Sequence, residues 1–220
     1  MNEHPLAPVI ERTLIEVSDE VLLEARWDKP DDPQSVVVFC HPHPQHRGTM
    51  TAPLMVGVTA ALVRAGIGVL RFNFRGVGES SGAWSSGDGE QDDIGAAIDV
   101  AVSTHPDLAL GIAGWSFGAA TSLLWQARER SSLPWAGIAP PVFSDLTPRL
   151  PDPAVLPAAA RTFIVGDRDQ FVTVEETSVY AESIGASIHI LRGSDHFFHF
   201  RFDKVAAHVT AALGGTVTSV

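Results

Sequence analysis

Apolar runs alternate with segments of helical spacing along the chain. Val36–Cys40 is an unbroken apolar run of the kind found in strands that are covered on both faces. The other predicted strands are Thr13–Val17, Val21–Trp27, Val69–Phe74, Leu108–Ala113, Trp135–Ala139, Thr162–Val165 and Ser187–Leu191. Predicted helices cover residues 53–65, 91–104, 117–130, 174–184 and 202–213.

This alternation predicts an α/β fold in which a mostly parallel sheet has helices on both faces. The first two strands, Thr13–Val17 and Val21–Trp27, are expected to form a short antiparallel pair. No repeat, low-complexity block or linker divides the chain, so we expect one domain over residues 1–220. In such sheets ligands bind beyond the carboxyl ends of the strands, and candidate chemistry is sought there.

Composition excludes or disfavours several classes of protein and partner. The 220 residues are 45% hydrophobic, which excludes a disordered chain. Acidic residues outnumber basic ones 26 to 15, and the net charge of −11 disfavours nucleic acid as a partner. The single cysteine, Cys40, excludes an internal disulfide. Because residues 1–11 lack the pattern of a secretory signal and no apolar run reaches about 18 residues, we expect a cytoplasmic protein with no membrane partner.

The segment Gly114–Gly118 reads G-W-S-F-G and lies between a predicted buried strand and a predicted helix. A serine in this setting sits on a turn so tight that its backbone is strained, and small residues are needed two positions to either side. Gly114 and Gly118 meet that need. The turn exposes the serine hydroxyl and directs the N-terminus of the next helix at the site. Ser116 is therefore the predicted nucleophile.

Serine needs a histidine to accept its proton and a carboxylate to orient that histidine. His196 follows the last predicted strand, and Asp167 and Asp169 follow the strand before it, so the chain order is serine, acid, histidine. We assign the acid to Asp169, because Asp167 stands at the strand end, where an aspartate commonly caps the turn. Asp145 is a third, weaker candidate.

These motifs resemble those of the α/β-hydrolase superfamily, and more narrowly those of small dienelactone-hydrolase-like proteins without a large cap. The matching segments are Phe39–Pro44, Arg71–Gly76, Gly114–Gly118, Gly166–Asp169 and Asp195–Phe198. The resemblance implies a serine hydrolase whose acid is the second aspartate of G-D-x-D, which is Asp169. Dienelactone hydrolases proper carry cysteine at the elbow, whereas this chain has Ser116.

An oxyanion hole needs two N–H donors. We expect one from the backbone of Phe117, directly after the nucleophile, and one from the loop after Val36–Cys40. Pro42 and Pro44 have no N–H, so the backbone of His43 is the predicted second donor.

Two other hypotheses compete. His41, His43 and His46 alternate with a spacing that resembles a zinc motif, which would make the protein a zinc hydrolase. The fold could also be a catalytically silent scaffold that binds a ligand or partner. For His41 itself, a buried hydrogen-bonding strut beneath the site is a further interpretation.

The remaining features are interpreted as parts of the pocket or of the core. The loop Arg75–Gly82 is expected beside the pocket, and Cys40 in the core. Trp115 and the phenylalanines that follow His196 are candidate pocket walls or core residues. The proline-rich excursion Pro140–Pro157 is too short for a cap domain, which favours modest esters or thioesters over long lipids. The sequence thus predicts a serine hydrolase with a small-molecule acyl substrate, no metal and no cofactor.

Overall fold

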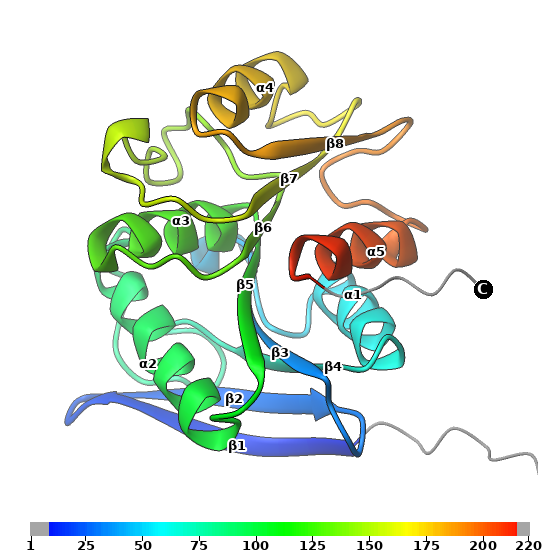
Figure 1. The fold of residues 1–220 in the computed structure, drawn as a ribbon. Helices are drawn as coiled ribbons and strands as arrows, with labels where there is room; N and C mark the ends of the chain where they lie inside the picture. Colours follow the sequence, from blue (N-terminus) through cyan, green and yellow to red (C-terminus); the bar gives the residue numbers. More distant parts are fainter. Residues whose placement is uncertain (1–8, 215–220) are drawn as a thin grey trace, which may run out of the picture.

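Eight strands form a single sheet in the computed structural model, which describes residues 9–214 (Figure 1). The strands are β1 (Val9–Ser18), β2 (Val21–Lys29), β3 (Ser35–Cys40), β4 (Ile67–Phe72), β5 (Ala109–Trp115), β6 (Trp135–Ile138), β7 (Arg161–Gly166) and β8 (Ser187–Leu191). Residues 1–8 and 215–220, which the predicted domain includes, lie outside the described residues.

The sheet order is β1-β2-β4-β3-β5-β6-β7-β8. β1 pairs antiparallel with β2, which in turn pairs antiparallel with β4. All pairs from β4 to β8 are parallel. The predicted N-terminal pair and the mostly parallel sheet are both confirmed.

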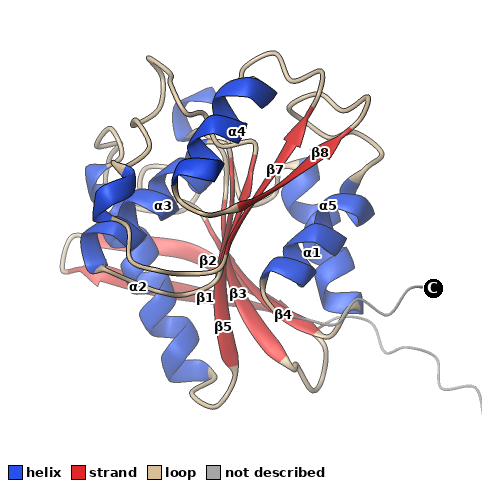
Figure 2. Cartoon of the chain, turned by 45° about the horizontal axis from the view of Figure 1, so that its top comes forward, coloured by secondary structure: helices blue, strands red, loops and turns tan. Residues whose placement is uncertain are grey.

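Helices cover both faces of this sheet (Figures 1 and 2). α1 (Pro53–Arg64) and α5 (Phe202–Ala212) lie on one face, and α2 (Asp88–Thr104), α3 (Phe117–Glu129) and α4 (Val174–Ser183) lie on the other. Each face buries its own apolar cluster. Leu54, Val58 and Val205 belong to the first cluster, and Ile94 and Leu123 belong to the second. Burial of apolar area on both faces explains why the central strands read as apolar runs.

Most element boundaries differ from the prediction by one or two residues, and β1 begins four residues earlier, at Val9. Two of the differences have a clear local reason. β4 ends at Phe72, because the N–H of Phe74 leaves the sheet and donates to the Nε2 atom of His41 at 3.0 Å. α2 begins at Asp88, earlier than residue 91. The Glu90 carboxylate accepts a hydrogen bond from the Gly87 N–H at 2.8 Å and so caps the first turn of α2. The apolar pattern does not predict this turn.

The carboxyl ends of β3, β5, β7 and β8 lie at one edge of the sheet, so the loops that follow them gather there. This is where the predicted site residues fall. Within residues 9–214 no helix combines the length and apolar character that crossing a membrane requires.

Candidate active site

Ser116 occupies the turn between β5 and α3. Its backbone has φ 53° and ψ −116°, a conformation that non-glycine residues rarely adopt. The Ser116 N–H donates to the Ile138 carbonyl of β6 at 2.8 Å, which fixes the turn to the neighbouring strand. The strained elbow predicted for this serine is therefore present.

The two glycines of the elbow are required by close backbone contacts. A Cβ atom on Gly114 would collide with the backbone of Gly118 and Ala119. A Cβ atom on Gly118 would collide with the carbonyl oxygens of Cys40 and His41. The second contact places the start of α3 directly against the end of β3, so the loop after β3 reaches the nucleophile.

His196 and Asp169 form a hydrogen-bonded pair. The Nδ1 atom of His196 lies 2.8 Å from Asp169 Oδ2, and the two side chains are 7% and 0% exposed. Asp169 Oδ1 also accepts the N–H groups of Phe171 at 2.8 Å and Val172 at 3.0 Å. In the tautomer in which Nδ1–H donates to the carboxylate, Nε2 is the acceptor that a base role needs.

The rival acids have other surroundings. The Asp167 carboxylate accepts a hydrogen bond from the N–H of Gly193 in the loop after β8. It therefore joins the two loops, and the capping of its own turn, which was expected of it, is performed by Asp169 instead. Asp145 is exposed on the proline-rich excursion. Of the three candidates, Asp169 is the one that contacts His196.

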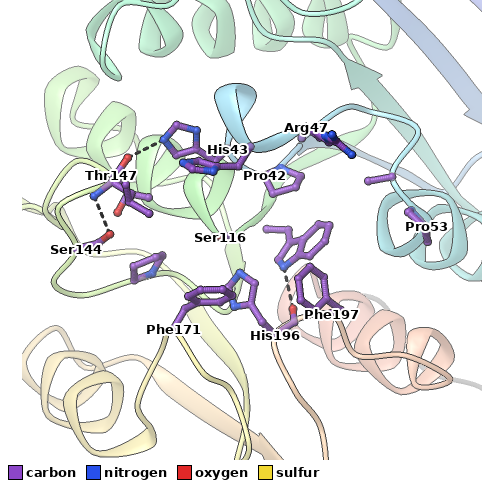
Figure 3. A pocket seen from close by; sticks show the side chains of 16 residues that line it. Pro42, His43, Arg47, Pro53, Ser116, Ser144, Thr147, Phe171, His196 and Phe197 are labelled. Carbon is purple, nitrogen blue, oxygen red and sulfur yellow. Dashed lines mark hydrogen bonds between the residues drawn. The ribbon is translucent and has the colours of Figure 1, made fainter.

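A cavity of about 390 Å³ opens over these residues (Figure 3). Its walls are mainly apolar, and Arg47 is the one Lys or Arg among the described residues that line it. Ser116 and His196 both line it, although no hydrogen bond joins their side chains in the described part of the chain. Such contacts often tighten only when substrate binds. The lining residues are Pro42, His43, His46, Arg47, Gly48, Ala52, Pro53, Trp115, Ser116, Pro141, Ser144, Leu146, Thr147, Phe171, His196 and Phe197.

His43 lines the cavity, and Phe117 directly follows Ser116. Within residues 9–214 neither backbone N–H donates a hydrogen bond to the protein. The His43 ring, in contrast, is fully engaged: Nε2–H donates to the Leu146 carbonyl at 2.7 Å, and Nδ1 accepts the Gln45 N–H at 3.2 Å. Burial lowers the pKa of His43, which keeps this ring neutral. The arrangement favours the backbone over the imidazole as donor, as the sequence hypothesis requires.

His41 is the buried strut that one interpretation of the sequence described. Its Nε2 atom accepts the Phe74 N–H at 3.0 Å, and Nδ1–H donates to the Pro42 carbonyl at 2.6 Å. Complete burial lowers its pKa to about 4, so the ring is neutral near pH 7.

The same contacts argue against the zinc hypothesis. Both ring nitrogens of His41 and of His43 already bond to the protein. Within the described ranges no group of three His, Cys, Asp or Glu side chains could hold a metal ion. The histidine run therefore does not fit a zinc site.

Several secondary expectations are corrected or refined. The loop Arg75–Gly82 does not line the cavity; its serines bond to β2 instead, with Ser80 Oγ accepting the Glu24 N–H at 2.9 Å. Of the phenylalanines after His196, Phe197 lines the cavity and Phe198 is buried in the core. Cys40 is a core residue, and burial raises the pKa of its thiol far from a reactive range.

Sequence reasoning missed the polar network beneath the β3 loop (residues 41–50). Arg71 Nη1–H donates to the Met50 carbonyl at 2.6 Å, and Asn73 Oδ1 accepts the Met50 N–H at 2.8 Å. Arg71 also forms a buried ion pair with Asp28. The sequence does contain a signal for this network, because Arg71 and Asn73 interrupt the apolar run Val69–Phe74. A polar side chain in a buried strand must find a hydrogen-bonding partner.

Comparison with known proteins places this geometry in a family. A model of the serine aminopeptidase S33 family matches residues 31–164, more than half of the chain. The chain belongs to this family of α/β hydrolases. The hydrolase is 32% identical over 200 residues to an uncharacterized protein of Rickettsia prowazekii, a match that covers 87% of this chain and 84% of that protein.

Solved structures agree with the family. An α/β serine hydrolase homologue from Coxiella burnetii has a TM-score of 0.78 and 29% identity, and the match covers 91% of this chain and 96% of that chain. An α/β serine hydrolase without a lid from Xanthomonas campestris has a TM-score of 0.77 and 27% identity, with 100% of both chains covered. An esterase from Pyrococcus furiosus shares the fold, with a TM-score of 0.80 and 20% identity over 97% of this chain and 94% of that chain.

Proposed function

We propose that this α/β hydrolase cleaves carboxylic esters or related acyl bonds through an acyl-enzyme on Ser116. The observation that carries the proposal is one cavity lined by a strained Ser116 and by a His196 ring whose Nδ1 atom is hydrogen-bonded to Asp169. A serine, a base and an orienting acid are the parts that nucleophilic acyl transfer needs.

In the proposed reaction, Ser116 Oγ attacks the acyl carbon while His196 Nε2 accepts the hydroxyl proton. The negative charge that develops on the carbonyl oxygen is stabilised by the N–H groups of Phe117 and His43. The tetrahedral intermediate then collapses, and the leaving alcohol takes the proton from His196. A water molecule, deprotonated by the same Nε2 atom, then attacks the acyl-enzyme. The bond between the acyl carbon and Ser116 Oγ breaks, Oγ takes the proton back from His196, and the acid is released. Asp169 holds the ring and stabilises the imidazolium that forms in each half of the reaction.

The cavity favours neutral acyl esters over peptides with a free amino terminus. An aminopeptidase substrate carries an ammonium group beside the reacting bond, and a buried or half-buried cation needs a carboxylate partner. Among the described residues the cavity wall includes no Asp or Glu, and Arg47, which does line it, repels a cation. The apolar side chains of Trp115, Phe171 and Phe197 suit an acyl or alkyl group instead.

The narrower resemblance to dienelactone-hydrolase-like proteins does not identify the substrate, because Ser116 stands where those enzymes carry cysteine. A lactone fits the same chemistry as an open ester, because both present an acyl carbon with an oxygen leaving group. The excursion Pro140–Pro157 contributes Pro141, Ser144, Leu146 and Thr147 to the wall and contains only the short 3₁₀ turn Pro153–Val155. A wall of this kind supports the proposal of modest substrates.

Steady-state hydrolysis of p-nitrophenyl butyrate tests the proposal, with alanine p-nitroanilide as the competing aminopeptidase substrate. We expect turnover of the ester, little turnover of the anilide, and loss of ester activity in Ser116→Ala. The exposed Ser103 on α2 provides the matched control, since Ser103→Ala should retain full activity. Preference for the anilide, or unchanged turnover in Ser116→Ala, would contradict the proposal.

A further inference from the structure

The three candidate catalytic residues lie in two parts of the sheet edge, and each part is held in place by its own hydrogen bonds. Asp169 and His196 follow β7 and β8, and their loops are joined to each other. The Arg168 N–H donates to the Ser194 carbonyl at 3.0 Å, in addition to the contact between Asp167 and Gly193. The acid and the base therefore keep their relative positions without help from the nucleophile.

Ser116 belongs to the other part, at the end of β5. Its N–H is bonded to Ile138 of β6, and Trp115 lies opposite Ile138 in the parallel register. The elbow is thus fixed to the centre of the sheet. The spacing between Ser116 and His196 depends on what connects β5 to the β8 loop (residues 192–198).

Trp115 supplies that connection. Its indole Nε1–H donates to the main-chain carbonyl of His196 at 3.1 Å, and the bond is drawn in Figure 3. Within the described residues, it is the one hydrogen bond between the elbow (112–118) and the β8 loop. Trp115 directly precedes Ser116 in sequence and is 5% exposed.

The indole ring also contacts the side chains of the same loop. Its centroid lies 5.9 Å from the His196 ring and 6.0 Å from the Phe197 ring, and the latter pair is edge-on at 81°. Phe171 contacts His196 with ring centroids 5.0 Å apart. These ring contacts therefore limit how far the His196 ring can tilt. The hydrogen bond from the indole N–H holds the main-chain carbonyl of His196 in place.

We infer that Trp115 is a positioning residue whose indole N–H sets the spacing between Ser116 Oγ and His196 Nε2. The inference rests on the proposed function, because it assigns the base role to His196. Proton transfer needs these two atoms within hydrogen-bond reach, and a displacement of about 1 Å can cost on the order of 10²-fold in rate. Because the indole N–H bonds to the main-chain carbonyl of His196, it fixes the position of this residue and does not compete with the hydrogen bond between the His196 ring and Asp169.

Trp115→Phe tests the inference, because it keeps an aromatic ring and removes the N–H donor. Trp135→Phe is the matched control. Trp135 is fully buried at the opposite end of β6, and its Nε1–H donates to Ser122 Oγ at 2.9 Å, so this variant loses the same kind of bond away from the cavity. Two rates are measured for each variant: hydrolysis of p-nitrophenyl butyrate and modification of Ser116 by a fluorophosphonate.

Trp115→Phe is expected to lower both kcat and the modification rate by about 10-fold to 100-fold. KM is compared in the variant with 3-benzothienylalanine at position 115, which keeps the wall that Trp115 contributes to the cavity, and it should change there by less than about 2-fold. Trp135→Phe should retain the wild-type values. Equal rates in Trp115→Phe and the wild type, or equal losses in the two variants, would overturn the inference while the proposed function stands.

A second substitution covers the case in which Trp115→Phe does not fold. Replacement of Trp115 by 3-benzothienylalanine keeps the shape of the indole and puts sulfur in place of the N–H. The same loss in kcat at unchanged KM is expected, and wild-type kcat overturns the inference. If the wild-type protein itself neither reacts with the fluorophosphonate nor hydrolyses the ester, the proposed function fails, and that outcome is distinct from either result above.

Discussion

The two sides of the candidate site are held in place by different kinds of interaction. The β3 loop, which carries the His43 N–H, is fixed from beneath by buried side chains that are distant in sequence. His41 bonds to Phe74, and Met50 is held between Arg71 and Asn73. These bonds lie within the core, so the position of the β3 loop depends on the integrity of the sheet around it.

The β7 loop (residues 167–172) and the β8 loop (192–198) are fixed mainly by carboxylates that cap nearby N–H groups. Asp169 caps Phe171 and Val172, and Asp195 Oδ1 accepts the Phe197 N–H at 3.0 Å. Aspartate stabilises tight turns in this way without a large buried network. On the β7 and β8 side, a substitution should therefore be able to lower activity without lowering stability. On the β3 side, a substitution that breaks these contacts should lower both.

The largest expected effect is the loss of activity in His196→Ala. Removal of a triad base lowers kcat on the order of 10⁴-fold. Asp169 keeps its two backbone N–H partners in this variant, so the melting temperature should stay within a few degrees of wild type. Ester hydrolysis and thermal unfolding measure the two quantities. A large fall in stability together with activity would contradict the separation described above.

Asp28→Ala should lower stability and activity together on the β3 side. Its ion pair with Arg71 has an N–O distance of 2.6 Å, and the two side chains are only 9% and 3% exposed. Loss of the carboxylate leaves a buried, unpaired guanidinium and should lower the free energy of unfolding by about 3–5 kcal/mol. Urea unfolding provides the measurement.

Asp203→Ala is the control for Asp28→Ala. It breaks the Arg64–Asp203 pair, which has the same 2.6 Å distance but side chains that are 65% and 82% exposed. That loss should be below about 1 kcal/mol. Equal destabilisation by the two variants would show that the β3 side does not depend on its buried pair.

The pH dependence of stability should report on His41. Its pKa is about 4 in the folded protein against 6.5 for an unperturbed histidine, because burial disfavours the charged ring. Below pH 6.5 the unfolded chain binds a proton that the folded chain rejects, so stability falls as the pH falls from 6.5 to 4. The loss from His41 alone is about 3 kcal/mol.

His41→Gln should flatten this acid branch of the stability curve, whereas a substitution of the exposed His199 should leave it unchanged. Urea unfolding at a series of pH values makes the comparison. An acid branch of the same slope in His41→Gln would mean that other groups, such as the partly buried His43, cause the loss.

Asp167→Ala should have only a small effect on activity and stability. The variant removes the side-chain contact between Asp167 and the Gly193 N–H, both at exposed positions. Because the backbone bond between Arg168 and Ser194 remains, stability should fall by about 1 kcal/mol and activity only a few-fold. Melting temperature and kcat check this, and a loss of activity comparable to that of His196→Ala would make Asp167 the acid instead of Asp169.

Sequence patterns predict the features of this molecule that depend on short segments. The apolar runs locate the strands because both sheet faces are covered, and the elbow is recognisable because Gly114 and Gly118 are sterically required. These two inferences need only local geometry and the edge at which parallel strands end. The choice of Asp169 over Asp167 does not follow from local geometry, because the local argument expected Asp167 to cap the turn, a role that Asp169 performs.

The remaining features depend on contacts between distant residues. The pairing of Arg71 with Asp28 and the bond from Trp115 to His196 join segments that the chain brings together only after folding. Polar residues in an apolar strand signal that such partners exist, but they do not identify them. The loop Arg75–Gly82 was misplaced beside the pocket for the same reason, since its partners on β2 are fixed by the sheet order.

Intact-mass analysis after incubation with a fluorophosphonate measures whether Ser116 is an activated nucleophile. We expect one covalent adduct on the wild-type protein, located at Ser116, and none on Ser116→Ala under the same conditions. An equal adduct on Ser116→Ala, or an unmodified wild-type protein that still hydrolyses esters, would contradict this expectation.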